Sequence, residues 1–196
     1  WSSDVCSSDL PTYGRIENIK KLTNSLINSK ISKENYELVV VSSDEETSEK
    51  IIWLKNQKNI EINLILENDR IINKNSNYRK KSLNYYENIG IKSSKNEWIL
   101  VCNDDMWMES DWYENFLTYL NINNKVYLVS SHIGDKNLGL RIPTIGTLIK
   151  NNIQEPLWLF DMTIIHKSIY EKINFLDENI GWYGKGADLS IAVGFL

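Results

Sequence analysis

The chain has 196 residues, 42% of them hydrophobic, and its 22 basic and 26 acidic residues give a formal net charge of −4. This length suits one domain with a substantial core. The charge argues against a nucleic-acid-binding protein, and no apolar run approaches the roughly 20 residues that cross a bilayer. The two cysteines make neither a disulfide framework nor a metal cluster, so we expect a cytoplasmic protein and leave peripheral association with a membrane open.

The first ten residues differ in composition from the rest of the chain. The segment "WSSDVCSSDL" contains no Asn, Lys or Ile, which are abundant elsewhere, and it repeats the triplet SSD. It has neither the charged start nor the apolar centre of a secretory signal. We interpret residues 1–10 as a non-native, adapter-like segment and leave them out of the predicted elements. Residues 11–196 are then a single incomplete domain, a fragment truncated at both ends.

From residue 11 onward, helical and strand-like patterns alternate. Apolar residues at three- and four-residue steps predict amphipathic helices, and short apolar runs predict strands covered on both faces. The predicted helices cover residues 15–29, 45–56, 82–94 and 110–120, and the predicted strands cover residues 38–41, 60–66, 97–102 and 125–134, before a strand and a short helix within residues 157–173. Residues 134–156 fit neither pattern clearly.

The helical patterns also predict which side chains face the sheet. We expect an inward position for Ile51, Ile52 and Leu54 in the second helix, and for Leu83, Tyr86 and either Ile89 or Gly90 in the third. Ser110 is a plausible N-cap for the fourth helix.

This alternation predicts an α/β fold in which a mostly parallel central sheet lies between two layers of helices, in a Rossmann-like three-layer α/β/α arrangement. Right-handed crossovers would place the carboxyl end of every strand at one edge of the sheet, where ligands of such folds bind. Three predicted strands end in polar or acidic groups at that edge, namely Asp44, residues 67–69 and residues 103–105.

The third of these groups is "NDD", in which two adjacent carboxylates follow an apolar strand. Neighbouring carboxylates repel each other, and a divalent cation relieves that repulsion. Magnesium and similar hard cations prefer oxygen ligands and commonly also grip substrate phosphates. The group could therefore anchor a metal ion and a diphosphate, although Asn-Asp-Asp also forms turns.

Five segments occur in an order that resembles the family 2 glycosyltransferases with the GT-A fold. They are "PTYGR", "ELVVVSSD", "NIG", "EWILVCNDD" and "GKGAD", and they span the chain from Pro11 almost to its end. In that family a strand precedes the loop that "PTYGR" resembles. Residues 1–10 occupy the place of that strand here.

The resemblance implies roles for individual residues. The implied nucleotide-binding residues of the first loop are Pro11, Thr12, Tyr13 and Arg15. Asp44 is implied to contact the nucleotide base. Asn88 of the "N-x-G" motif, and Asn103 and Asp104 of the "D-x-D" region, complete the implied nucleotide-binding set. Asp105 is the implied ligand of Mn²⁺ or Mg²⁺, and Asp188 the implied catalytic base. The chain departs from the family at Asn103 and Ala187, where many members carry an acid.

The implied function is metal-dependent transfer of a sugar from a nucleotide-diphospho-sugar to an acceptor hydroxyl, with inversion at the anomeric carbon. The family is compatible with polysaccharide biosynthesis, and the acceptor can be a glycan, a lipid-linked saccharide or a protein. Two alternatives stay open. One is a non-catalytic nucleotide- or sugar-binding module, and the other is a sugar nucleotidyltransferase, although "PTYGR" matches the phosphate loop of that class poorly.

Several residues of the chain also have a possible structural role that involves no ligand. Asp44 can serve as the N-cap of the next helix. Gly90 can permit close packing of a helix on the sheet. We expect His166 to be a surface residue between a strand and a helix, and Cys102 to be an inert buried thiol. Trp182, close to Asp188 in sequence, is a candidate for stacking on a sugar ring.

Overall fold

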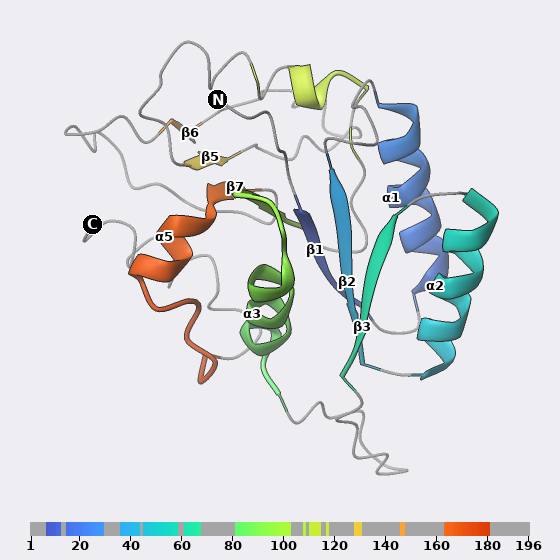
Figure 1. Cartoon of the computed structure of the whole chain (residues 1–196), viewed down its shortest axis with the longest axis horizontal. Coiled ribbons are helices and arrows are strands. Elements are labelled where there is room, and N and C mark those ends of the chain that lie inside the picture. The colour runs from blue at the N-terminus through green and yellow to red at the C-terminus, as the bar shows by residue number, and fades with distance from the viewer. Residues whose placement is uncertain are drawn as a thin grey trace, which may run out of the picture.

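The computed structural model describes residues 7–12, 15–29, 36–43, 45–58, 61–67, 81–102, 108, 110–114, 117, 128–130, 146–147 and 163–180. These residues form a sheet with helices on both faces, as the alternation of patterns predicts (Figure 1). The described helices are α1 (Ile16–Asn28), α2 (Glu45–Lys58), α3 (Leu83–Ser93) and α5 (Lys167–Lys172). Helices α1 and α2 lie on one face of the sheet, and α3 and α5 on the other (Figure 1).

The sheet has a parallel half and an antiparallel half. Its described strands are β1 (Ser7–Thr12), β2 (Glu37–Ser42), β3 (Ile62–Leu66), β4 (Trp98–Val101), β5 (Leu128–Ser130), β6 (Gly146–Thr147) and β7 (Thr163–His166), and their spatial order is β3-β2-β1-β4-β7-β5-β6. Strands β3, β2, β1 and β4 are parallel to one another, whereas β7 is antiparallel to both β4 and β5, and β6 is antiparallel to β5.

The core is divided between the two faces by the alternation of side chains along the strands. Leu38 and Val40 of β2 belong to the cluster that also contains the buried residues of α1 and α2. Ile99 and Val101 of β4 belong to the second cluster, with residues of α3 and α5. Cys102, directly after β4, is fully buried, as predicted.

Helix α2 corrects one of the predicted inward positions. Ile51 and Leu54 are buried, but Ile52 is 51% exposed. Each residue advances about 100° around a helix, so positions 51 and 54 share a face from which position 52 is rotated away. In α3, Tyr86 and Gly90 are buried, and Ile89 is the partly exposed alternative.

Strand β7 corrects the expectation that every strand ends at the same edge. It runs against β4, and the amide of Lys167, the first residue after β7, donates to the carbonyl of Glu97, just before β4 begins, at 2.6 Å. Therefore β7 ends at the edge where β1 to β4 begin. We call this the amino edge, and the opposite one, where β1 to β4 end, the carboxyl edge.

Part of the segment omitted from the predicted elements lies at the centre of the sheet. Strand β1 begins at Ser7 and pairs in parallel with β2 on one side and with β4 on the other. Strand pairing uses backbone groups that every residue except proline carries in full, so unusual composition did not prevent this placement. The interpretation of residues 1–10 as non-native stays a prediction.

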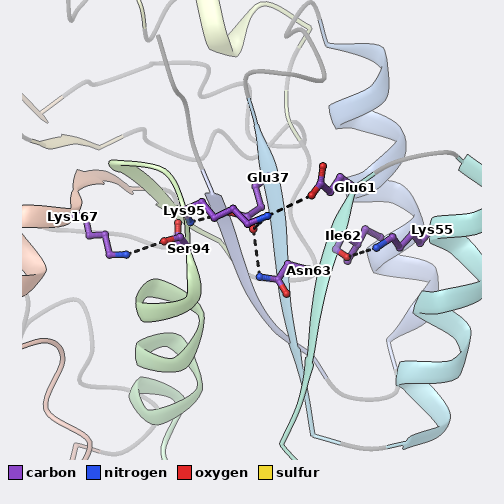
Figure 2. A network of polar contacts seen from close by, with 8 residues as sticks. All are labelled: Glu37, Lys55, Glu61, Ile62, Asn63, Ser94, Lys95 and Lys167. Carbon is purple, nitrogen blue, oxygen red and sulfur yellow. Dashed lines mark hydrogen bonds and ion pairs between the residues drawn. The ribbon is translucent and has the colours of Figure 1, made fainter. Parts of the chain in front are cut away.

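A polar network fixes the amino edge (Figure 2). The buried carboxylate of Glu37, at the start of β2, accepts hydrogen bonds from the amide of Lys95 at 3.1 Å and from Asn63 Nδ2 at 3.3 Å. Lys95 Nζ lies 3.8 Å from the same carboxylate and 3.6 Å from Glu61. This network joins β2 and β3 to the connection between α3 and β4. Burial raises the pKa of the phenol of Tyr36, the residue that precedes Glu37 in sequence.

Candidate functional site

Three of the strands that lead into the predicted nucleotide-binding segments end at the carboxyl edge. Strand pairing places Thr12 of β1 opposite Ser42 of β2, and Ser42 opposite Leu66 of β3, so these three strands end level with one another. Pro11 and Thr12 are the last two residues of β1. Asp44 follows β2 by two residues, and residues 103–105 follow β4 directly after Cys102. The strands that precede the predicted segments therefore end at one edge of the sheet, and the placement of the segments themselves stays a prediction.

Arg15 occupies the N-cap position of α1, directly beyond this edge. Its side chain is exposed, and its carbonyl accepts hydrogen bonds from the amides of Asn18 at 3.0 Å and Ile19 at 3.2 Å. The amino end of a helix carries a partial positive charge and backbone N–H groups that suit a phosphate. The position agrees with the predicted role of Arg15 in the first loop, and its contact with a nucleotide stays a prediction.

The structure does not describe seven of the residues that carry predicted or candidate roles. They are Tyr13, Asp44, Asn103, Asp104, Asp105, Trp182 and Asp188. The predicted metal ligand, the catalytic base and the contact with the nucleotide base therefore stay predictions. Within the part of the chain that the structure does describe, no group of three or more His, Cys, Asp or Glu residues could hold a metal ion.

Ser43 was not singled out by sequence reasoning. It lies between the end of β2 and Asp44, its residue is 1% exposed, and its hydroxyl has no hydrogen-bond partner. A buried polar group without a partner is uncommon and calls for an explanation such as an absent ligand. The sequence signal was weak, because "SSDEE" reads equally well as the start of a helix.

The first turn of α3 also reaches the carboxyl edge. Ser82 caps the helix by accepting from the amide of Tyr85 at 3.2 Å. The hydroxyl of Tyr85 donates to the carboxylate of Glu67 at 3.4 Å, and the amide of Glu67 donates to the carbonyl of Ser42 at 2.8 Å. The ammonium group of Lys81 lies 4.6 Å from the centre of the Tyr85 ring. The amino end of α3 is therefore tied to the ends of β2 and β3.

Asn88, a predicted nucleotide-binding residue, lies in the middle of α3 and is 2% exposed. Its Nδ2 donates to the carbonyl of Leu176 and to the carboxylate of Glu178, both at 2.9 Å, and its Oδ1 accepts from the amide of Leu176 at 3.0 Å. These partners belong to the segment that follows α5. Sequence reasoning could not find them because they lie 88 and 90 residues away, and the nucleotide contact stays a prediction.

An open pocket of about 510 Å³ lies beside this contact. It is lined by Asn88 and Lys92 of α3 and by residues 173–178. The ammonium group of Lys92 lies 4.6 Å from the centre of the Phe175 ring, across the space between helix and segment. The pocket therefore lies between α3 and the segment that follows α5.

His166 lies between a strand and a helix, as predicted, but it is partly buried and not a surface residue. It ends β7 and is the N-cap of α5, where its Nδ1 accepts from the amide of Ser168 at 3.3 Å. Its ring meets that of Trp98 edge to face, with 5.2 Å between centroids. Separately, none of the described helices is both long enough and apolar enough to cross a membrane.

Comparisons with known proteins agree with this architecture. A family model described as glycosyl transferase family 2 matches residues 10–173. No curated protein matches the sequence significantly. The crystal structure of S. aureus TarS 1-349 has a TM-score of 0.70 and 13% identity, covering 96% of this chain and 54% of that chain.

Two structures with bound ligands are similarly close. TarS 1-349 in complex with UDP-GlcNAc has a TM-score of 0.70 at 12% identity, over 96% of this chain and 52% of that one. The mannosyltransferase PcManGT from Pyrobaculum calidifontis, in complex with GDP-Man and Mn²⁺, has a TM-score of 0.67 at 17% identity, over 95% of this chain and 50% of that one. This chain thus spans about half the length of these proteins. The likeness supports the GT-A fold.

Proposed function

The chain belongs to glycosyl transferase family 2, and we propose that it transfers a sugar from a nucleotide-diphospho-sugar to an acceptor hydroxyl with the help of a divalent metal ion. The observation that carries the proposal is the shared carboxyl edge of β1, β2 and β4. The segments "PTYGR", "SSD" and "NDD" each lie at the end of one of these strands. Ligands of open α/β sheets bind at such an edge.

We assign Asp105 as the ligand of the metal ion, and we expect the diphosphate of the sugar donor to lie beside this ion. Mn²⁺ and Mg²⁺ bind carboxylate oxygen atoms as ligands, so the residue types of "NDD" fit such an ion. PcManGT was solved with Mn²⁺ and GDP-Man, which supports the same combination here. A bound ion would stabilise the negative charge that develops on the departing diphosphate. Asn103 and Asp104 would complete the polar surroundings.

The remaining assignments concern the nucleotide and the acceptor. Residues 11–15 and Asp44 would bind the nucleotide, with Arg15 and the amino end of α1 facing its phosphates. Asp188 would accept the proton of the acceptor hydroxyl while that oxygen bonds to the anomeric carbon. The bond from this carbon to the diphosphate breaks, and its electron pair leaves with the diphosphate. Attack from the face opposite the leaving group inverts the anomeric centre.

The proposal also retains the broader expectations from the sequence. These are a cytoplasmic role in polysaccharide assembly, with peripheral membrane association left open, and a glycan, lipid-linked saccharide or protein as the acceptor.

The first test is a donor assay on the full-length protein with Mn²⁺ present. UDP-GlcNAc and GDP-mannose are the first donors to try, because TarS was solved with UDP-GlcNAc and PcManGT with GDP-Man. We expect release of the nucleoside diphosphate, and we expect EDTA to abolish it. Donor binding without release or transfer would favour the binding module instead, and pyrophosphate release from a nucleoside triphosphate would favour the nucleotidyltransferase.

Two substitutions separate the proposed roles. Asp188→Asn should lower transfer about 10²–10⁴-fold, which is the usual contribution of general-base help, while donor binding is retained. Asp105→Ala should instead remove the metal-dependent part of donor binding. Calorimetric titration with the donor, with and without Mn²⁺, measures the second effect. Wild-type transfer by the Asp188 variant would refute the assignment of the base.

A further inference from the structure

We propose that Glu67, directly after β3, selects guanine as the base of the nucleotide donor, so that the donor is a GDP-sugar. The inference rests on the proposed function, because it assumes that the nucleotide base lies at the end of β2, where Asp44 follows in sequence. It goes further by naming the base. TarS was solved with UDP-GlcNAc and PcManGT with GDP-Man, so the likeness to them leaves the base open.

The backbone of Glu67 is fixed at the carboxyl edge. Its amide donates to the carbonyl of Ser42 at 2.8 Å, which continues the parallel pairing of β3 with β2 by one residue. The residue is partly buried. Glu67 therefore stands beside the end of β2, the strand that leads to Asp44.

The side chain of Glu67 is oriented by α3. The hydroxyl of Tyr85, in the first turn of this helix, donates to Glu67 Oε2 at 3.4 Å. Tyr85 is itself held in place, because its amide donates to the hydroxyl of Ser82 at 3.2 Å and its ring meets that of Tyr86 edge to face, with 5.5 Å between centroids. Figure 1 shows that β3 ends and α3 begins at the same edge of the sheet.

This part of the edge has hydrogen-bonding capacity left for a ligand. Within the described part of the chain, the Glu67 carboxylate accepts one hydrogen bond, from Tyr85, whereas an ionised carboxylate offers about four acceptor sites. Ser43, the residue after Ser42, is 1% exposed and its hydroxyl has no hydrogen-bond partner, which independently indicates a ligand near the end of β2. The ends of β2 and β3 thus offer unused polar groups.

A carboxylate distinguishes the nucleotide bases by their hydrogen-bond donors. It only accepts hydrogen bonds, so it pairs best with a base edge that presents two adjacent N–H groups. Guanine presents N1–H and its exocyclic amino group side by side. Uracil presents a single N3–H between two carbonyl oxygens, which repel a carboxylate, and adenine and cytosine present an amino group beside an unprotonated ring nitrogen. Guanine is therefore the base that suits Glu67.

The alternative is a purely structural role for Glu67. In that case the hydrogen bond from Tyr85 only ties β3 to α3, and loss of the carboxylate lowers stability and weakens the binding of all nucleotides alike. Selection of guanine predicts instead that the effect depends on the base. Because GDP and UDP share the ribose and the diphosphate, a comparison of these two nucleotides separates the base from the contacts of the sugar and the metal ion.

The first experiment uses the wild-type, full-length protein. Calorimetric titration with GDP, IDP and UDP, each with Mn²⁺ present, compares three bases on the same diphosphate. GDP should bind at least about tenfold more tightly than UDP, because a hydrogen bond to a charged group contributes about that much affinity. IDP keeps N1–H but lacks the exocyclic amino group, so it should bind at least about fivefold more weakly than GDP.

Glu67→Gln is the decisive variant, because it keeps the size of the side chain but replaces one acceptor oxygen with a donor. We expect the affinity for GDP to fall at least about tenfold, while the affinity for UDP changes by less than about twofold or rises. The preference for GDP over IDP should shrink to less than about twofold. Such coupling between one side chain and one substituent of the base requires a direct contact between them.

Glu61→Gln is the matched control. Glu61 directly precedes β3, so it lies at the amino edge, where its side chain is 72% exposed and 3.6 Å from Lys95 Nζ. This variant should leave the affinities for GDP and UDP unchanged. Tyr85→Phe keeps Glu67 but removes the hydroxyl that orients it, so it should weaken GDP binding about threefold and spare UDP. It takes the place of Glu67→Gln if that variant folds poorly.

Each result supports or overturns the selection of guanine. If the wild-type protein binds UDP as tightly as GDP, or if Glu67→Gln weakens both nucleotides equally or neither, the role of Glu67 is refuted and the proposed function stands. If no nucleoside diphosphate binds in the presence of Mn²⁺ and no donor is turned over, the proposed function fails, and the role assigned to Glu67 fails with it.

Discussion

At the residue scale, Ser43 is the feature of the carboxyl edge that sequence reasoning did not single out. Its hydroxyl is buried and unpaired at the carboxyl edge, next to the predicted contact with the nucleotide base. Burying a polar group without a partner costs about 1–3 kcal/mol. A donor that supplied a hydrogen bond would recover part of that cost on binding, which links the orphaned hydroxyl to the proposed site.

This link leads to a prediction for Ser43→Ala. The free protein should become more stable, by up to about 1 kcal/mol, because the unpaired hydroxyl is gone, and donor affinity should fall about fivefold, as the loss of one hydrogen bond implies. Urea unfolding and titration with the donor measure the two effects. Thr23→Val is a suitable control, because the Thr23 hydroxyl on α1 is also buried and unpaired but lies away from the site. Unchanged donor affinity in Ser43→Ala would show that the donor does not use this hydroxyl.

At the scale of elements, the amino edge depends on the carboxylate of Glu37. It joins β2 to β3 through Asn63 and to the start of β4 through the amide of Lys95 (Figure 2). Hydrogen bonds to charged groups contribute about 1.5–3 kcal/mol each, and an unpaired buried donor is costly. The network therefore stabilises the edge opposite the proposed site.

We expect Glu37→Ala to lower the free energy of unfolding by roughly 2–4 kcal/mol, because it leaves the amide of Lys95 and Asn63 Nδ2 without their acceptor. Glu61→Ala is the comparison. The Glu61 side chain is 72% exposed and lies 3.6 Å from Lys95 Nζ, and an exposed ion pair contributes less than about 0.5 kcal/mol here. Urea unfolding followed by circular dichroism measures both. Equal losses in the two variants would contradict the account of the buried carboxylate.

The elements also show what a sequence pattern can and cannot reveal. Continuous apolar runs correctly predicted β2 and β4 as strands covered on both faces, because burial on two faces leaves a local signature. The direction of β7 has no such signature, since it depends on pairing with β4. The contact of Asn88 with Leu176 was equally hidden, because it joins residues distant in sequence. The roles of Asp105 and Asp188 came from a family resemblance, and they stay predictions.

At the scale of the whole molecule, the reversed direction of β7 has a consequence for the site. The parallel half of the sheet delivers its strand ends to the carboxyl edge, whereas β7 ends at the amino edge, beside the start of β4. The residues after β7 therefore start from the edge opposite the proposed site. After α5 the described chain lies against α3, where Asn84 and Asn88 donate to the carbonyls of Asp177 and Leu176.

The central position of β1 gives a test of how well residues 1–10 suit this fold. Asp9 is paired with Val39 of β2 and with Val101 of β4, both of which are buried. Strands between two buried parallel neighbours are normally apolar, so an aspartate in the sequence of β1 departs from the usual composition of such a strand. We therefore expect Asp9→Val to raise the free energy of unfolding by at least about 1 kcal/mol. Urea unfolding measures this change, and Glu49→Val, an exposed acid on α2, controls for the general effect of removing a negative charge. A loss of stability in Asp9→Val would instead indicate that β1 is suited to its place with the sequence it has.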